Sequence, residues 1–98
     1  MYLSGQLPFK IGTRDLPEGI EAQTQQVLSN IDFLLKEAGS AMNQILKVRI
    51  YIPNVGLWGV VNEIYAAYLG DHKPARCIVP SRELHYGCLI EVECVAFV

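Results

Sequence analysis

The chain has 98 residues, of which 51% are hydrophobic and 18% charged, with a formal net charge of −2 and a pI near 5.6. This length predicts one domain, residues 1–98, with a single core. The acidic balance, without a run of lysine and arginine, argues against a binder of nucleic-acid phosphates. No apolar run reaches the roughly 18 residues that span a membrane, and no signal-peptide pattern opens the chain. We therefore expect a cytosolic protein.

The first forty residues predict one strand and one long helix. "MYLSGQL" at the start is typical of a strand, and the polar loop "KIGTRDLPEG" follows it. From Ile20 to Ala38 the apolar residues recur at helical spacing, which predicts an amphipathic helix. Pro17 suits the entrance of this helix, and Gly39 suits the position just after its end. The apolar stripe consists of Val27, Leu28, Ile31, Leu34, Leu35 and Ala38.

The rest of the chain predicts strand, helix, strand and strand. Residues 45–53 alternate as a strand, and residues 57–69 form a shorter amphipathic helix that Gly70 ends. A short strand at 76–79, the connection "PSRELHYG" and a last alternating strand at 88–98 follow. The apolar faces of the two alternating strands are Leu46, Val48, Ile50 and Ile52 in the first, and Ile90, Val92, Cys94 and Ala96 in the second.

These elements indicate an α+β fold of two layers. Each helix has one apolar stripe, so both helices can cover the same face of one mixed or antiparallel sheet. The second face of the sheet still carries apolar side chains, which a monomer would expose to water. We therefore expect this face to pack against other subunits. The side chains concerned are Tyr51, Leu89, Val95 and Phe97.

Cysteines and histidines are few and are not spaced as metal ligands. Cys77, Cys88 and Cys94 are odd in number and contain no Cys-x-x-Cys pair, so they indicate neither a zinc site nor a disulfide framework. Free, mostly buried thiols are the expected state. His72 and His85 both fall in predicted connections and are expected to be solvated.

Two charged residues occupy unusual places. Glu91 lies inside the last strand between two apolar residues, and Arg76 opens a strand directly after "HKPA". Pro74 makes the segment before Arg76 stiff, and arginine offers a planar fork that binds a carboxylate through two hydrogen bonds. From local pattern alone, each residue has two equally good interpretations. Glu91 is either solvated or part of a polar pocket, and Arg76 forms either a surface ion pair or an anion-binding site.

Four segments in order resemble one known family. "SGQLP", "LSNIDFLLKEAGS", "VNEIYAAYLGDHKPARCIV" and "LIEVECVA" together are similar to the RidA/YjgF (L-PSP) family of enamine and imine deaminases. The resemblance covers essentially the whole chain. It implies a chorismate-mutase-like α+β fold and a homotrimer whose sheets face inward as a central barrel. It also implies a ligand pocket at each boundary between subunits.

The resemblance implies a role for five residues. Arg76 would hold the substrate carboxylate, and Glu91, expected on a neighbouring strand, would position or activate the hydrolytic water. Ser4 and Gly5 would line the pocket, and Asn62 would support the segment before Arg76 or contact substrate. The implied reaction converts 2-aminoacrylate-type enamines or 2-imino acids, such as 2-iminopropanoate and 2-iminobutanoate, to 2-oxo acids and ammonia. It requires neither a metal nor an organic cofactor.

The chain departs from the family pattern at two places. Relatives usually carry a further N-terminal segment with a tyrosine that reaches the pocket, so the first strand is expected to be shortened here. Many relatives also have a cysteine two residues after the arginine, where this chain has Ile78, and Cys77 should face the other way. Two other functions therefore stay open: a non-catalytic trimer that binds small 2-oxo acids, and, against the acidic charge, a ribonuclease.

Overall fold

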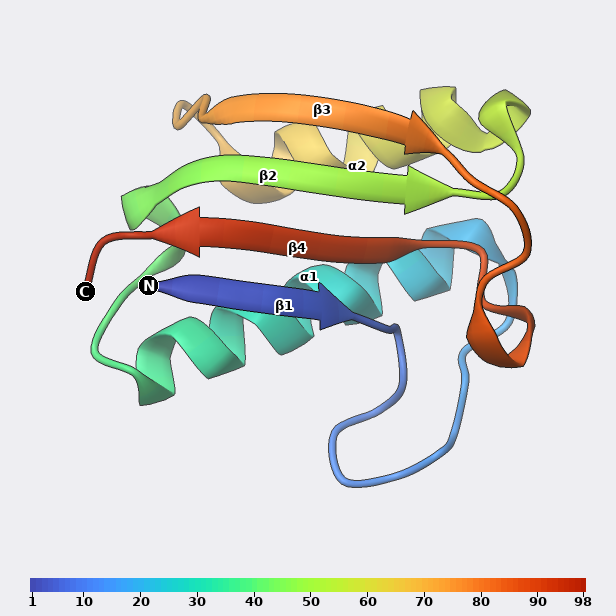
Figure 1. Ribbon diagram of the computed structural model, residues 1–98, viewed down its shortest axis with the longest axis horizontal. Helices are drawn as coiled ribbons and strands as arrows, with labels where there is room; N and C mark the ends of the chain where they lie inside the picture. The colour runs from blue at the N-terminus through green and yellow to red at the C-terminus, as the bar shows by residue number, and fades with distance from the viewer.

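The computed structural model describes all of residues 1–98 as one mixed four-stranded sheet with two helices. The sheet has the order β1-β4-β2-β3, in which β2 and β3 are parallel and the other neighbours antiparallel. Both helices cover one face of it (Figure 1), which confirms the two-layer α+β fold. The elements are β1 (Tyr2–Gln6), α1 (Gly19–Glu37), β2 (Ile45–Ile52), α2 (Trp58–Leu69), β3 (Ala75–Pro80) and β4 (Glu91–Ala96).

The core lies between the sheet and the helices. Most of the stripe predicted for α1 is buried there, and Gly39 and Gly70 follow the two helices with φ of 82° and 62°, backbone conformations that favour glycine. Neither helix combines the length and the apolar composition that crossing a membrane requires. The buried cluster comprises Val27, Leu28, Ile31, Leu35, Ile45, Val48, Ile50, Ile52, Val61, Tyr65, Leu69, Ile90, Val92, Cys94 and Ala96.

The prediction for the first residues of β2 was wrong. Leu46 was expected in the core, but its side chain is 46% exposed, whereas Ile45 is only 2% exposed. The pairing of β2 with β4 shifts register between Ile45 and Lys47, and a shift of this kind puts neighbouring residues out of strict alternation. From Val48 onward the alternation holds.

The last strand is shorter than predicted. β4 begins at Glu91 rather than Cys88, because a short 3-10 turn at His85–Gly87 precedes it. Tyr86 in this turn has φ of 59°, a left-handed conformation that a strand does not contain. β4 also ends before Phe97, whose N–H donates to the carbonyl of Gln44 outside the sheet. The alternating pattern therefore continued beyond the paired strand at both ends.

The sheet face turned away from the helices is called the open face below. Register pairs across β1, β4 and β2 define it, because paired residues point to the same side. It carries Tyr2, Lys47, Arg49, Tyr51, Glu91, Glu93 and Val95.

Candidate functional site

Arg76 lies on the edge strand β3 and points to the helix side of the sheet. Its register partner in β2 is Val48, a core residue. The Arg76 Cζ lies 4.7 Å from the ring centroid of Trp58 and 4.9 Å from that of Tyr65, both in α2. Its Nη1 donates to Oδ1 of Asn62 at 2.8 Å. Asn62 thus contacts the arginine itself.

A surface cavity of about 420 Å³ adjoins Arg76. No carboxylate of the chain forms an ion pair with this arginine, since the salt bridges join Lys36 to Asp32 and Arg49 to Glu93. The positive charge of Arg76 is therefore available to an anion. The cavity is lined by Asn62, Tyr65, Ala66, Leu69, Gly70, His72, Lys73, Pro74 and Arg76.

His72, at the rim of this cavity, is not the solvated loop residue that was expected. Its side chain is half-buried, and its Nε2 lies 2.7 Å from the carbonyl oxygen of Ile45 at the start of β2. This contact ties the connection before β3 to the sheet. A structural role for His72 follows from it.

Glu91 lies on the open face, against β1. A Cβ added to Gly5 would come within 2.1 Å of Oε2 of Glu91, so only glycine leaves the carboxylate where it is. Ser4 is the preceding residue of β1 and is exposed. The carboxylate of Glu91 makes no hydrogen bond or ion pair with another side chain. The structure thus brings Gly5 and Glu91 together.

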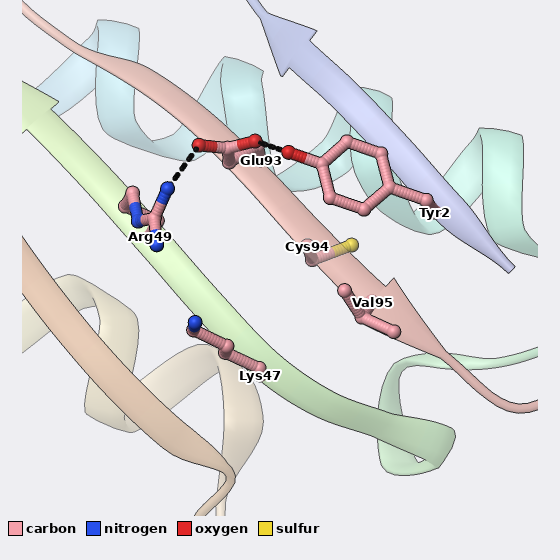
Figure 2. A pocket seen from close by; sticks show the side chains of 6 residues that line it. All are labelled: Tyr2, Lys47, Arg49, Glu93, Cys94 and Val95. Carbon is pink, nitrogen blue, oxygen red and sulfur yellow. Dashed lines mark hydrogen bonds and ion pairs between the residues drawn. The ribbon is translucent and has the colours of Figure 1, made fainter.

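Glu93, two residues further along β4 on the same face, is fully engaged. The hydroxyls of Tyr2 and Tyr51 both donate to its carboxylate, and Nη1 of Arg49 lies 3.4 Å from Oε1. Figure 2 shows Tyr2 and Arg49 approaching this carboxylate from the strands on either side of β4. The adjoining hollow of about 50 Å³ has room for a few water molecules. Of the two glutamates on the open face, only Glu91 is free to act on a ligand.

The electrostatics of this network keep Glu93 charged. The hydrogen bonds from Tyr2 and then Tyr51, together with the charge of Arg49, hold the pKa of Glu93 below its ordinary value. The same hydrogen bond raises the pKa of Tyr2, because ionising the phenol would place two negative groups in contact. Glu93 therefore acts as a structural anion that joins β1, β4 and β2.

The expectation that Arg76 and Glu91 lie on neighbouring strands was wrong. β2 separates β3 from β4 in the sheet. Arg76 is level with Val48 and Cys94, so Glu91 is two strands across and three residues along, roughly 14 Å between backbones. Their side chains also leave opposite faces of the sheet. One small ligand cannot reach both residues within a single copy.

The structure thus divides the predicted site into two half-sites. Arg76 and Asn62 form the first on the helix side of β3, and Gly5 and Glu91 form the second on the open face of β1 and β4. Ser4 lies in β1 where the register with β4 shifts, and its side chain makes no hydrogen bond with Glu91. Cys77 is exposed and pairs in register with Arg49, so it faces the open side, away from the Arg76 side chain. No three His, Cys, Asp or Glu side chains form a cluster that would hold a metal ion.

Sequence reasoning missed two aromatic residues and one carboxylate network. Trp58 and Tyr65 flank Asn62 at helical spacings of four and three, so the pattern of α2 already placed the three on one face. Nothing in the sequence indicated that Arg76 would meet this face. The partners of Glu93 come from β1 and β2, and only the strand order brings them together.

Comparisons with known proteins agree over the whole chain. The family model described as "Endoribonuclease L-PSP" matches residues 1–98. A RutC family protein of Pyrococcus horikoshii is 38% identical over 98 residues, which cover 99% of this chain and 78% of that protein. A RutC family protein of Aquifex aeolicus is 39% identical, with 98% of this chain and 78% of that protein covered.

Solved structures give the same result. A protein of the Rid family from Yersinia pestis, YyfA, superposes with a TM-score of 0.95 at 44% identity, over 99% of this chain and 79% of that one. RidA from an Antarctic Psychrobacter gives 0.94 at 34% identity, with the same two coverages of 99% and 79%. A family model matches residues 1–98, and relatives above 30% identity belong to the same family. The chain therefore belongs to the RidA/YjgF (L-PSP) family.

Proposed function

We propose that this protein hydrolyses 2-imino acids, and the 2-aminoacrylate-type enamines from which they form, to 2-oxo acids and ammonia. The observation that supports this proposal most is that each half-site has a charged group without a partner of opposite charge. Arg76 is a guanidinium without an acidic partner, and Glu91 is a carboxylate without a donor. A 2-imino acid offers a carboxylate for the first and an electrophilic C=N carbon for water held by the second.

The chemistry needs only these groups. Arg76 binds the substrate carboxylate and so fixes the position of the adjacent C=N carbon. Glu91 accepts a hydrogen bond from a water molecule and takes its proton as the oxygen bonds to that carbon. That proton passes to the nitrogen as the C=N π bond opens, which gives a carbinolamine. The hydroxyl proton of the carbinolamine then passes through Glu91 to the nitrogen as the C=O bond forms and the C–N bond breaks, so that ammonia and the 2-oxo acid leave. Proton and electron counts balance without a metal, a cofactor or an oxidant.

The opposite placement of the half-sites leads us to propose that each complete site lies between two copies. Arg76 on the edge strand of one copy would meet Glu91 on the open face of the next. Three copies arranged cyclically would form three such sites and cover the open faces, where Tyr2 is 63% exposed. Light scattering behind a sizing column would give about three times the 10.9 kDa of one chain.

Mixing two inactive variants tests this arrangement directly. Arg76→Ala and Glu91→Gln should each abolish the acceleration of ammonia release from 2-iminobutanoate generated in the assay by an amino acid oxidase. After the two variants are unfolded and refolded together in equal amounts, about a quarter of the sites should contain both intact residues and regain activity. Arg82→Ala and Glu83→Ala, which change exposed residues of the connection after β3, serve as matched controls.

The outcomes separate the proposals. No recovery in the mixture, with both variants correctly assembled, would mean that the site does not combine these residues from two copies. Full activity of Arg76→Ala would remove the carboxylate role. Calorimetric binding of 2-oxobutanoate without any turnover in the wild-type protein would establish the non-catalytic alternative, a trimeric carboxylate binder.

The ribonuclease description of the matching family model receives no support from the charge of this chain. Eight lysines and arginines stand against ten aspartates and glutamates, whereas a phosphate-backbone binder needs a basic surface.

We also propose a cytosolic location, supported by three free cysteines. A relative of Schizosaccharomyces pombe at 37% identity is named as mitochondrial, and cell fractionation would decide the compartment here.

A further inference from the structure

The guanidinium of Arg76 contacts two aromatic rings. Trp58 and Tyr65 lie seven residues apart on α2, which separates them by about 10 Å along the helix axis. The Arg76 Cζ lies within 5 Å of both ring centroids, at 4.7 and 4.9 Å. The guanidinium therefore contacts both rings at once, and the aromatic π-electrons stabilise its charge.

Asn62 contacts the same guanidinium through a hydrogen bond. It lies between the two aromatic residues on the same face of α2 and accepts from Nη1 of Arg76 at 2.8 Å. One edge of the guanidinium is thereby occupied, while its other N–H groups, in the same plane, stay free. Arg14, which contacts one ring only, that of Tyr86 at 5.0 Å, has no such arrangement.

We propose that Trp58 and Tyr65 are positioning residues, which hold the guanidinium plane of Arg76 so that a planar carboxylate binds edge-on through two hydrogen bonds. This inference rests on the proposed role of Arg76 as the carboxylate-binding residue. An exposed arginine otherwise samples many rotamers, and ordering it on binding weakens affinity. The aromatic pair removes that disorder before the ligand arrives.

The first experiment measures the affinity for 2-oxobutanoate, a non-reacting carboxylate, by calorimetry. Trp58→Leu should weaken binding about 3- to 10-fold, the range expected for losing one cation–π contact, and Trp58→Phe should stay close to wild type. In an Arg76→Lys background the same Trp58→Leu change should have little further effect, since there is no planar guanidinium to orient. Tyr86→Leu removes the other arginine–ring contact of the chain and should leave affinity unchanged.

Two outcomes of the calorimetry would overturn the inference. One is an equal loss of affinity on Trp58→Leu in the wild-type and the Arg76→Lys backgrounds, because the effect would then not depend on a guanidinium. The other is an unchanged affinity of Trp58→Leu in the wild-type background. Circular dichroism and the measured mass of the assembly check that each variant is folded.

A second experiment does not depend on the ligand. The ¹⁵N relaxation of the Arg76 Nε–H group, assigned by its absence in Arg76→Lys, should report an ordered side chain in the wild type and in Trp58→Phe. The same group should be mobile in Trp58→Leu. Unchanged order in Trp58→Leu refutes the positioning role. Failure of the wild-type protein to bind 2-oxobutanoate, with the order of Arg76 still dependent on Trp58, refutes the proposed function alone.

Discussion

Gly5→Ala tests the second half-site with a single methyl group. The added Cβ would lie 2.1 Å from Oε2 and 3.0 Å from Cδ of Glu91. Restoring an ordinary contact requires the carboxylate oxygen to move by about 1 Å, and a misplacement of that size in a catalytic group lowers rates by about 100-fold. We therefore expect ammonia release from 2-iminobutanoate to fall by about two orders of magnitude.

The same substitution should leave the fold intact. The atom displaced is the end of a flexible side chain, at a cost of about 1 kcal/mol for an unfavourable rotamer. Replacing a strand glycine restricts the unfolded chain and returns about 0.5–1 kcal/mol. The two effects nearly cancel, so the midpoint of urea unfolding should stay close to that of the wild type.

Two comparisons make the assay decisive. Gly59→Ala is the matched control, because a Cβ at Gly59 meets nothing within 4 Å and should leave the rate unchanged. Adding Gly5→Ala to Glu91→Gln should produce little further loss if the methyl group acts through this carboxylate. A Gly5→Ala protein that is folded and as fast as the wild type would refute the assignment of Glu91 as the group that positions water.

Three further predictions concern stability and accessibility. Tyr65→Phe should raise the free energy of unfolding by about 1 kcal/mol in urea titrations, because the Tyr65 hydroxyl is buried without a hydrogen-bond partner; a clear loss of stability would contradict this. The pKa of Glu93 is lower in the folded protein than its ordinary value of 4.5, so the free energy of unfolding should fall as the pH drops below 4.5 toward that lowered pKa. Glu93→Gln should flatten this part of the pH curve, and an unchanged pH profile in that variant would count against the network. Cys88 and Cys94 should resist iodoacetamide at neutral pH until the protein unfolds, since both are buried and burial raises the pKa of Cys94 to about 11; native-state modification detected by mass spectrometry would show that this part of the core opens.

The secondary structure was largely predictable because each element has its own hydrophobic period. The stripe of α1 and the alternation of Ile90, Val92 and Cys94 are local patterns, and all of these residues except Leu34 and Ala38 in the α1 stripe are buried. The errors occur where pairing overrides pattern. Leu46 lies at a register shift between β2 and β4, and Cys88 lies before the strand because of a left-handed turn at Tyr86. Sequence alternation contains no information on either.

The sequence predicted which residues are candidates for the site, but not how they are arranged in space. Arg76 after a stiff proline segment and Glu91 within an apolar run are unusual in the sequence itself. Whether they meet depends on strand order, and the order β1-β4-β2-β3 places β2 between them. The position of Gly5 also depends on strand order, because only the pairing of β1 with β4 puts it against the Glu91 carboxylate.

By itself, the sequence determined the fold class, the element order and the family, since hydrophobic periodicity and ordered motifs are properties of the chain taken locally. Only the tertiary structure decided that Arg76 turns to the helices and Glu91 to the open face. A residue's side of a sheet follows from the register of its strand against the neighbours, and register is set by packing between segments far apart in the chain. For that physical reason the sequence named the two candidate residues, and the structure separated them into half-sites that, in the proposed function, a second copy would join.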